Sequence, residues 1–338
     1  MRPPRRTQLA LRLVLSLAVA AGLLAVLMFL GGVRPGELLA GLARLSPRDY
    51  ATALALQVAL YALRAWRFHL LLPAARRPGA LPLLSITTAY TMASVILPAK
   101  IGEASFVVYG GRVAGIPASE GTACLFVARL LDVATLALGM SLACLAVWAT
   151  GSFAHISWIG PLGWCLLPFS LAVFVASARG DLLVGWIDRG SRLLGLDHTK
   201  TGAKLLEFGE RLSVALRAAG SRKRLYAAAL VSLPAWLCVF LFCAVLAEAL
   251  GLPPEITFAQ ATLGSGLAIA TSLLPLSAFA NFGTLEAGWV LGFHALGVEP
   301  SIAAATGVGV HVVQLANAVV LGLLGHVGMA IAAGRTQG

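Results

Sequence analysis

Long apolar segments are the feature that most constrains the fold of this chain. A helix needs about 20 apolar residues to cross a bilayer. Eight segments approach or exceed that length, at residues 9–30, 50–72, 82–98, 118–149, 158–178, 224–250, 257–277 and 301–333, and a shorter amphipathic helix is expected near 284–297. Hydrophobic residues make up 59% of the chain and charged residues 12%, which leaves little sequence for a soluble core. We therefore predict an all-α polytopic membrane protein, with residues 1–338 forming one integral membrane domain.

Basic residues dominate the charge, and their positions indicate membrane topology rather than nucleic-acid binding. The net charge is +11. Lys and Arg cluster between apolar segments without interleaved aromatic residues, as expected of topology determinants and of contacts with anionic lipids at the cytoplasmic face. Residues 179–224 alone contain ten of them. We expect this stretch to be a basic amphipathic segment on the cytoplasmic surface.

Two apolar segments end in similar broken motifs, about 180 residues apart. The first reads Leu97-Pro98-Ala99-Lys100-Ile101-Gly102-Glu103. The second reads Leu274-Pro275-Leu276-Ser277, followed by Asn281-Phe282-Gly283-Thr284-Leu285-Glu286. Proline and glycine interrupt helices, and interruptions at matching places in two halves of a membrane protein indicate a transport site between inverted repeats. We predict helix breaks at Pro98, Gly102, Pro275 and Gly283.

The basic segment decides how many of the apolar segments cross the membrane. If all eight crossed, residues 179–224 would lie outside, against the positive-inside rule. The conflict disappears if 82–98 enters from the cytoplasm and returns after Pro98, while 257–277 enters from the outer face and returns after Pro275. The sequence thus predicts about six full spans and two oppositely oriented re-entrant hairpins, with both termini cytoplasmic. Eight full spans remain the alternative.

Ionisable residues within apolar segments are costly and are candidate functional groups. Arg64 and Arg67 share one face of the second span, where they either reach the headgroup layer or bind a lipid phosphate. Arg129 and Asp132 are spaced to form a structural pair within one helix, or Arg129 binds an anionic headgroup while Asp132 tunes it or pairs with Lys100. Lys100 and Glu103 belong to the first break, where unwound backbone also offers N–H groups to an anion.

The second break and the last span carry the other polar candidates. Glu286 falls in the first turn of a helix, where it either stabilises the helix N-terminus or contributes to the site. Asn281 lies nearby, among small hydrogen-bonding residues of the kind expected where irregular backbone lines a wet cavity. His311, Gln314 and Asn317 form a polar stripe that either joins helices or lines the path of a polar headgroup.

The sequence contains none of the common catalytic or nucleotide-binding signatures. It has no G-x-S-x-G, H-E-x-x-H, P-loop or dinucleotide glycine motif. Its five cysteines lie in apolar segments without metal-ligand spacing and are expected to be buried hydrophobic residues. We expect no cofactor, no metal site and no enzymatic activity, so any transport would be downhill, ion-coupled or driven by a partner.

Four motifs in order resemble the lysylphosphatidylglycerol synthase transmembrane-domain, or flippase-like, family. They are Arg64-Ala65-Trp66-Arg67, Leu97 to Glu103, Ala128-Arg129-Leu130-Leu131-Asp132, and Leu274-Pro275 with Gly283-Thr284-Leu285-Glu286-Ala287, spread over about residues 9–333. The resemblance implies an inner-membrane protein of a prokaryote that moves lipids between leaflets. The fused aminoacyl-transferase domain of two-part members has no counterpart in this sequence. Ala278-Phe279-Ala280-Asn281 also replaces a more glycine-rich stretch of the family pattern.

These observations lead us to expect translocation of an anionic or amino-modified phospholipid, or another polar-headed lipid. The expected substrate-binding residues are Arg64, Arg67, Lys100, Glu103, Arg129, Asp132, Asn281, Glu286, His311 and Asn317. Two alternatives are a membrane transferase or phosphatase with Glu103 and Asp132 as acid and base, and a non-transporting partner of a lipid-modifying enzyme. An association with such an enzyme and self-association into oligomers both stay open, and no nucleic-acid partner is expected.

Overall fold

The protein is described here by a computed structural model. It describes residues 36, 42–43, 45–73, 77–151, 156–178, 180–193, 195, 199, 202–203, 222–272 and 279–335. Across these ranges the regular structure is helical and no strand occurs, which confirms the predicted all-α class. The predicted first span at 9–30 and most of the basic segment at 179–224 lie outside the described residues.

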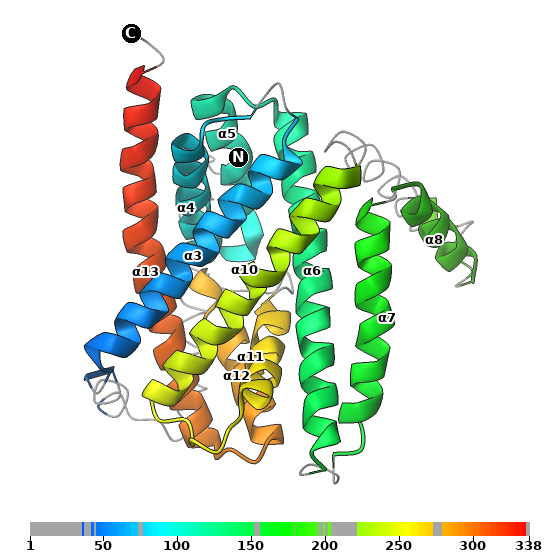
Figure 1. Cartoon of the computed structure of the whole chain (residues 1–338), viewed down its shortest axis with the longest axis vertical. Helices are drawn as coiled ribbons and strands as arrows, with labels where there is room; N and C mark the ends of the chain where they lie inside the picture. The colour runs from blue at the N-terminus through cyan, green and yellow to red at the C-terminus, as the bar shows by residue number, and fades with distance from the viewer. Residues whose placement is uncertain are drawn as a thin grey trace, which may run out of the picture.

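Long helices form the frame of the molecule (Figure 1). They are α3 (Pro47–Leu71), α6 (Ala118–Ala149), α7 (Ile159–Ala178), α10 (Arg222–Ala249) and α13 (Pro300–Arg335). Four described stretches are long and apolar enough to cross a membrane, namely Ala118–Ala149, Ile159–Ser177, Lys223–Ala249 and Pro300–Ala332. At a rise of about 1.5 Å per residue, each exceeds or approaches the ~30 Å of a bilayer core. The chain is thus a multi-pass membrane protein.

The first predicted break forms the tip of a helical hairpin. α4 (Ala80–Ile96) descends to Leu97, the 3-10 helix η2 (Pro98–Glu103) makes the tip, and α5 (Ala104–Ala114) returns. Pro98 has no N–H to continue the helix of α4. A side-chain carbon at Gly102 would lie 2.0 Å from the carbonyl oxygen of Ala93, so only glycine permits this close return of the tip onto α4.

A second hairpin is built from α11 (Phe258–Ser272) and α12 (Thr284–Ala295), with the short 3-10 helix η3 (Phe279–Asn281) between them. The two helices pack with their backbones close together, since a side-chain carbon at Gly292 would lie 2.7 Å from the carbonyl oxygen of Gly264. Gly283 supplies the positive φ of 88° that starts α12. The predicted break at Pro275 lies outside the described residues.

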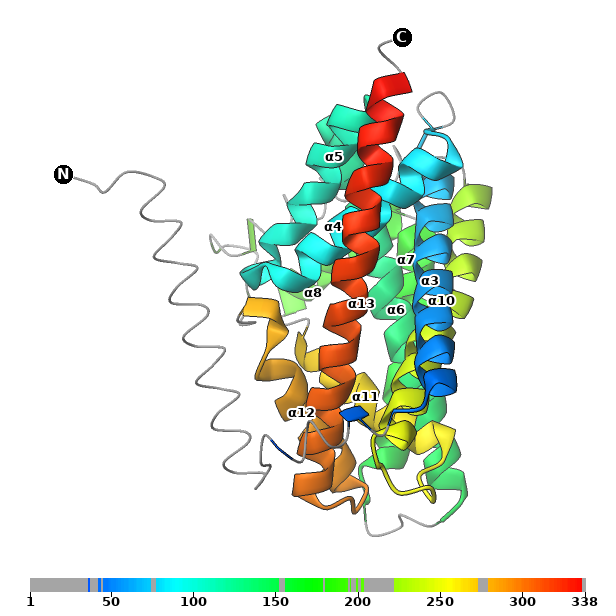
Figure 2. The same ribbon diagram turned by 90° about the vertical axis from the view of Figure 1, so that its left-hand side faces the viewer.

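The two hairpins enter the bundle from opposite ends (Figure 2). α4 and α5 occupy the half near the C-terminal end of α13, whereas α11 and α12 occupy the other half (Figures 1 and 2). Their tips η2 and η3 are in contact. Neither hairpin runs the full height of the long helices (Figure 2). Two opposed re-entrant hairpins require such short helices, whereas eight full spans would require helices that cross the whole bundle.

Small residues allow α13 to lie against the first hairpin. A side-chain carbon at Gly322, Gly325 or Gly328 would come within 2.4 Å of an atom of α4, at Met92, Thr88 and Ser85 respectively. These glycines recur every three residues and so share one face of α13. The opposite face carries large apolar residues that are exposed in the described structure: Leu323, Leu324, Val327 and Ile331.

Charge differs between the two ends of the bundle, although Arg48 at the start of α3 lies at the end opposite the start of α10. The end near the start of α10 carries Arg77, Arg112, Lys223 and Arg224, and Arg224 donates a hydrogen bond to the carbonyl oxygen of Leu72 at the end of α3 (3.1 Å). At the other end, the connections at 150–158, 250–257 and 296–299 contain neither Lys nor Arg. The basic segment begins in α8 (Gly180–Leu193), which follows α7 at the basic end (Figure 1).

Candidate functional site

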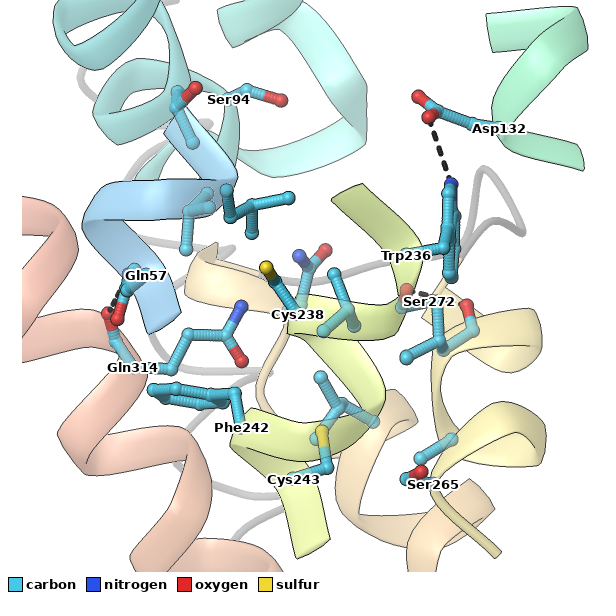
Figure 3. A pocket seen from close by; sticks show the side chains of 18 of the residues that line it. Gln57, Ser94, Asp132, Trp236, Cys238, Phe242, Cys243, Ser265, Ser272 and Gln314 are labelled. Atoms are coloured by element: carbon cyan, nitrogen blue, oxygen red, sulfur yellow. Dashed lines mark hydrogen bonds between the residues drawn. The ribbon is translucent and has the colours of Figure 1, made fainter. Parts of the chain in front are cut away.

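A cavity of about 160 Å³ lies among the long helices and the two hairpins. Residues of α3, α4, α6, α10, α11, α12 and α13 line it, together with Asn281 of η3. Figure 3 shows Asp132 and Ser94 towards one end and Cys243 and Ser265 towards the other. Because both hairpins contribute to its wall, the cavity sits where the two hairpins meet.

An ion-pair network forms one end of this cavity, centred on Asp132 of α6. Arg67 Nη1 of α3 lies 2.7 Å from Asp132 Oδ1, and Arg129 Nη1 lies 3.1 Å from Asp132 Oδ2. Arg129 Nη2 lies 3.0 Å from Glu103 Oε1 at the tip of the first hairpin. The expected pair within α6 is therefore present, and it belongs to a chain of four charges that joins α3, α6 and η2.

Two uncharged residues of α10 complete the network. Trp236 Nε1 donates a hydrogen bond to Asp132 Oδ1 (3.1 Å, Figure 3), and Arg67 Nη1 donates one to Ser232 Oγ (3.2 Å). Sequence analysis missed both residues. The available signal was their spacing of four in an otherwise apolar segment, which places two polar groups on one helix face.

Accessibility divides the four charges into two kinds. The side chains of Arg67 and Asp132 are 2% and 6% exposed, whereas those of Arg129 and Glu103 are 31% and 20% exposed. Arg67 Nε and Arg129 Nε are both buried and have no hydrogen-bond partner among the described residues. Arg129 is thus the charged residue of the network best placed to bind an anion in the cavity.

Arg64 adds a further cation to the cavity wall. Within the part of the chain that the structure describes, it has no carboxylate partner within 4.0 Å. The formal charges of Arg67, Asp132, Arg129 and Glu103 sum to zero, so Arg64 leaves this end of the cavity with an excess positive charge. An anionic group is the complementary ligand.

A second ionisable cluster lies behind the cavity wall, at the second hairpin. Glu286 Oε1 is 2.5 Å from His311 Nδ1, and Glu286 Oε2 accepts a hydrogen bond from the backbone N–H of Gly283 (2.7 Å). Glu286 and His311 are 0% and 1% exposed. Neither lines the cavity, although their chain neighbours Leu285 and Val310 do.

A third cluster joins α3 to α13 by hydrogen bonds between uncharged groups. Asn317 accepts a hydrogen bond from Tyr50 Oη (2.9 Å) and donates one to Gln57 Oε1 (3.1 Å). Gln57 also donates to the carbonyl oxygen of Gln314 (3.4 Å), and both glutamines line the cavity (Figure 3). Asn317 itself is buried between the two helices.

The structure brings together five of the expected binding residues at one end of the cavity or in the network beside it: Arg64, Arg67, Glu103, Arg129 and Asp132. Asn281 lines the cavity, whereas Glu286, His311 and Asn317 are buried behind its wall. The side chain of Lys100 lies outside the described residues. No group of three or more potential metal ligands occurs among the residues described.

An apolar groove of about 330 Å³ adjoins the cavity. It runs among α6, α10 and α11, and its walls include Leu142, Leu237, Phe240 and Phe258. Trp236 belongs to both linings: its N–H group binds Asp132 in the polar network, while it also forms part of the groove wall. A charged cavity and an apolar groove therefore share one wall.

Comparison with known families gives one match. The family described as "Lysylphosphatidylglycerol synthase TM region" matches residues 13–322, which is most of the chain. A search of curated proteins finds no match.

Proposed function

Because the chain belongs to the lysylphosphatidylglycerol synthase TM region family, a membrane domain associated with lipid modification or translocation, we propose that it moves an anionic lipid between the leaflets of a membrane. The lipid headgroup occupies the cavity between the two hairpins. The observation that carries this proposal is the partly exposed Arg129, held by the carboxylates of Asp132 and Glu103, on the same cavity wall as Arg64, which has no carboxylate partner among the described residues.

The chemistry of these side chains favours a phosphate. A guanidinium presents several N–H donors in a planar fork, which matches two oxygens of a phosphate. Charged groups inside a membrane are costly and persist where they are paired or line a polar pathway. Arg67 and Asp132 neutralise one another in the buried part of the network, which leaves Arg129 and Arg64 for the ligand.

The adjoining groove suits the hydrocarbon part of the same lipid. Leu142, Leu237 and Phe258 are about half exposed in the structure, as expected for side chains that contact lipid tails. A phospholipid needs a polar site and an apolar site side by side, and Trp236 separates the two here. Trp commonly lies between polar and apolar surroundings because its N–H group is polar and its rings are not.

The two hairpins provide a route for alternating access. Each reaches the centre from a different end of the bundle, and the tips meet next to the cavity. In transporters built from inverted repeats, rocking of one repeat against the other exposes a central site to each side in turn. Movement of η2 opens the cavity towards one leaflet, and movement of η3 opens it towards the other.

The charge distribution supports an orientation in the cytoplasmic membrane. The end with Arg77, Arg112, Lys223 and Arg224 faces the cytoplasm and its anionic lipids, because cytoplasmic loops carry an excess of Lys and Arg. The C-terminal end of α13 then lies on the cytoplasmic side.

A chemical reaction on the lipid is not part of the proposal. Asp132 accepts hydrogen bonds from Arg67, Arg129 and Trp236, so donors of this chain already occupy both of its oxygens. Glu103 is held by Arg129. The proposal therefore treats this chain as a transporter rather than an enzyme.

Lipid movement in reconstituted vesicles tests this proposal. Purified protein is placed in phosphatidylcholine vesicles with phosphatidylglycerol, phosphatidylethanolamine or phosphatidylserine that carries a fluorophore on one acyl chain, and an impermeant reductant then measures the fraction in the outer leaflet. We expect the protein to accelerate exchange of at least one lipid, and Arg129→Gln to abolish the acceleration.

Arg112→Gln is the matched control, because Arg112 is exposed at the end of α5, away from the cavity. It should leave exchange unchanged. Exchange of every lipid at the rate of empty vesicles, or full activity of Arg129→Gln, would overturn the proposal.

A further inference from the structure

Glu286 and His311 form a buried acid and base pair that the headgroup site does not use. The pair joins α12 to α13, with 2.5 Å between Glu286 Oε1 and His311 Nδ1. Both residues are buried, and the Phe282 ring packs against the imidazole with 4.6 Å between the ring centroids. Paired ionisable residues within membrane domains are candidate members of proton pathways.

Two buried ionisable groups in contact can hold one proton without a net charge. A buried carboxylate with no compensating charge is strongly destabilised in a medium of low polarity. One proton shared between the carboxylate and the imidazole makes the pair neutral overall, whichever atom carries it. Loss of that proton leaves a net negative charge, which requires water or a cation nearby.

Few other ionisable groups on the packed elements affect this balance. α11 carries none, α10 places Cys243 in the apolar cluster around Trp289, and α4 places Tyr90 on the cavity. η2, whose tip contacts η3, carries Lys100 and Glu103. The other ionisable residues on packed helices are His294 on α12, Tyr109 and Arg112 on α5, His326 and Arg335 on α13, and Arg222, Lys223, Arg224, Tyr226, Cys238 and Glu248 on α10. α3, which is hydrogen-bonded to α13, carries Arg48, Asp49, Tyr50, Tyr61, Arg64, Arg67 and His69.

The pair is also connected to the hairpin tip. Glu286 Oε2 accepts the N–H of Gly283, which sits in a turn where Ala280, Asn281 and Gly283 all have positive φ. Positive φ is unfavourable for Ala, so this turn depends on the contacts that hold it. Asn281 lines the cavity. A change in the charge on Glu286 therefore alters a contact that holds the cavity wall.

We propose that Glu286 and His311 bind a proton whose uptake and release are coupled to passage of the headgroup through the cavity. The inference rests on the proposed lipid transport. The proton comes from water on one side, is held between Glu286 Oε1 and His311 Nδ1 while the site is closed, and returns to water on the other side when the η3 turn moves. No bond to the lipid forms or breaks, and the proton gradient supplies the free energy.

Vesicles with an imposed pH difference test the coupling. The labelled lipids described above report headgroup movement, and an enclosed pH-sensitive dye reports proton flux. In the unaltered protein we expect the pH difference to change the rate of lipid movement, with proton flux that depends on the lipid being present. Glu286→Gln keeps the acceptor for Gly283 but cannot exchange a proton, and we expect loss of the response to the pH difference while exchange without a gradient persists.

Two further variants make the result interpretable. His311→Gln removes the other member of the pair, and lipid movement in this variant should also fail to respond to the pH difference. It therefore tests the coupling even if Glu286→Gln fails to fold. His326→Gln, on the same helix but bound to Tyr109 and the backbone, should respond like the unaltered protein. A normal response in a folded Glu286→Gln or His311→Gln protein overturns the inference.

The unaltered protein separates this inference from the transport proposal. Lipid movement that ignores the pH difference overturns proton coupling and leaves transport standing. Absence of movement for all of the labelled lipids overturns transport, and coupling with it.

Discussion

Arg67 of α3 and Asp132 of α6, 65 positions apart in the sequence, face each other at 2.7 Å with both side chains almost fully buried. Asp132 also binds Arg129, so one carboxylate compensates two guanidinium groups. The network therefore depends more on Asp132 than on Arg67. Loss of Asp132 leaves the buried Arg67 without a carboxylate and leaves Arg129 with Glu103 alone, whereas loss of Arg67 leaves Asp132 paired with Arg129.

Replacement of Asp132 should therefore be strongly destabilising. Removal of one partner from a buried ion pair costs about 3–5 kcal/mol, because the remaining charge is left without compensation. We expect Asp132→Asn to lower the free energy of unfolding by that order and Arg67→Met to lower it by less. Thermal or denaturant unfolding in detergent measures both variants, and an equal or reversed order would contradict the shared role of Asp132.

The tip of the first hairpin should tolerate no side chain at Gly102. Gly102→Ala places a carbon 2.0 Å from the carbonyl oxygen of Ala93, so the tip must separate from α4. Gly111→Ala is the matched control, since the new carbon would meet only the carbonyl oxygen of Ile116 at 3.5 Å, and alanine favours a helix by about 1 kcal/mol. We expect Gly102→Ala to lower the unfolding temperature and block lipid exchange, while Gly111→Ala leaves both unchanged or raises the temperature. Equal behaviour of the two variants would contradict the close packing of the tip.

Asn317 should contribute to the stability of the protein rather than to binding of the lipid. Asn317→Ala removes hydrogen bonds to Tyr50 and Gln57, and hydrogen bonds between helices in membrane proteins are worth roughly 0.6–2 kcal/mol each. We expect a loss of stability of that order, with retention of bound anionic lipid as measured by native mass spectrometry. Val320→Ala, at an exposed position of the same helix, should change stability by less than ~0.5 kcal/mol. Loss of bound lipid in Asn317→Ala without loss of stability would assign this residue to the ligand instead.

Opposed hairpins make a specific topology prediction. Ser119 follows the first hairpin at the basic end, and Glu255 precedes the second hairpin at the other end, and both are exposed. In a variant without the native cysteines, we expect Ser119→Cys to react with an impermeant thiol reagent only from the cytoplasmic side. Glu255→Cys should react only from the outer side. Labelling of both from one side would contradict the arrangement.

Sequence reasoning predicted the elements of this fold but not the contacts between them. Pro98 and Gly102 act through local backbone geometry, and the charge of the loops constrains topology, so the opposed hairpins were predictable. The Arg129 and Asp132 pair was also predictable, because residues three apart lie on one helix face.

The rest of the site depends on which helix faces meet. Nothing in the sequence near Arg67 indicates that it binds Asp132 rather than water, and Trp236 looks like an ordinary membrane aromatic residue until α10 is packed against α6. Helix rotation also decides that Arg64 lines the cavity while Arg67, three residues later, is buried. Such choices result from packing of the whole bundle, which a single sequence does not display.

The glycine row on α13 limits how the first hairpin can move. Gly322, Gly325 and Gly328 form notches on α13, and the side chains of Met92, Thr88 and Ser85 of α4 occupy them. Rotation of α13 would turn Leu323, Leu324 or Val327 into a space that has no room even for a methyl group. Translation along the helix axis meets a similar obstacle, because each of the three α4 side chains would have to leave its notch. The first hairpin and α13 are therefore expected to move as one unit, so that a shift of Glu103 relative to Arg129 requires α13 to move as well.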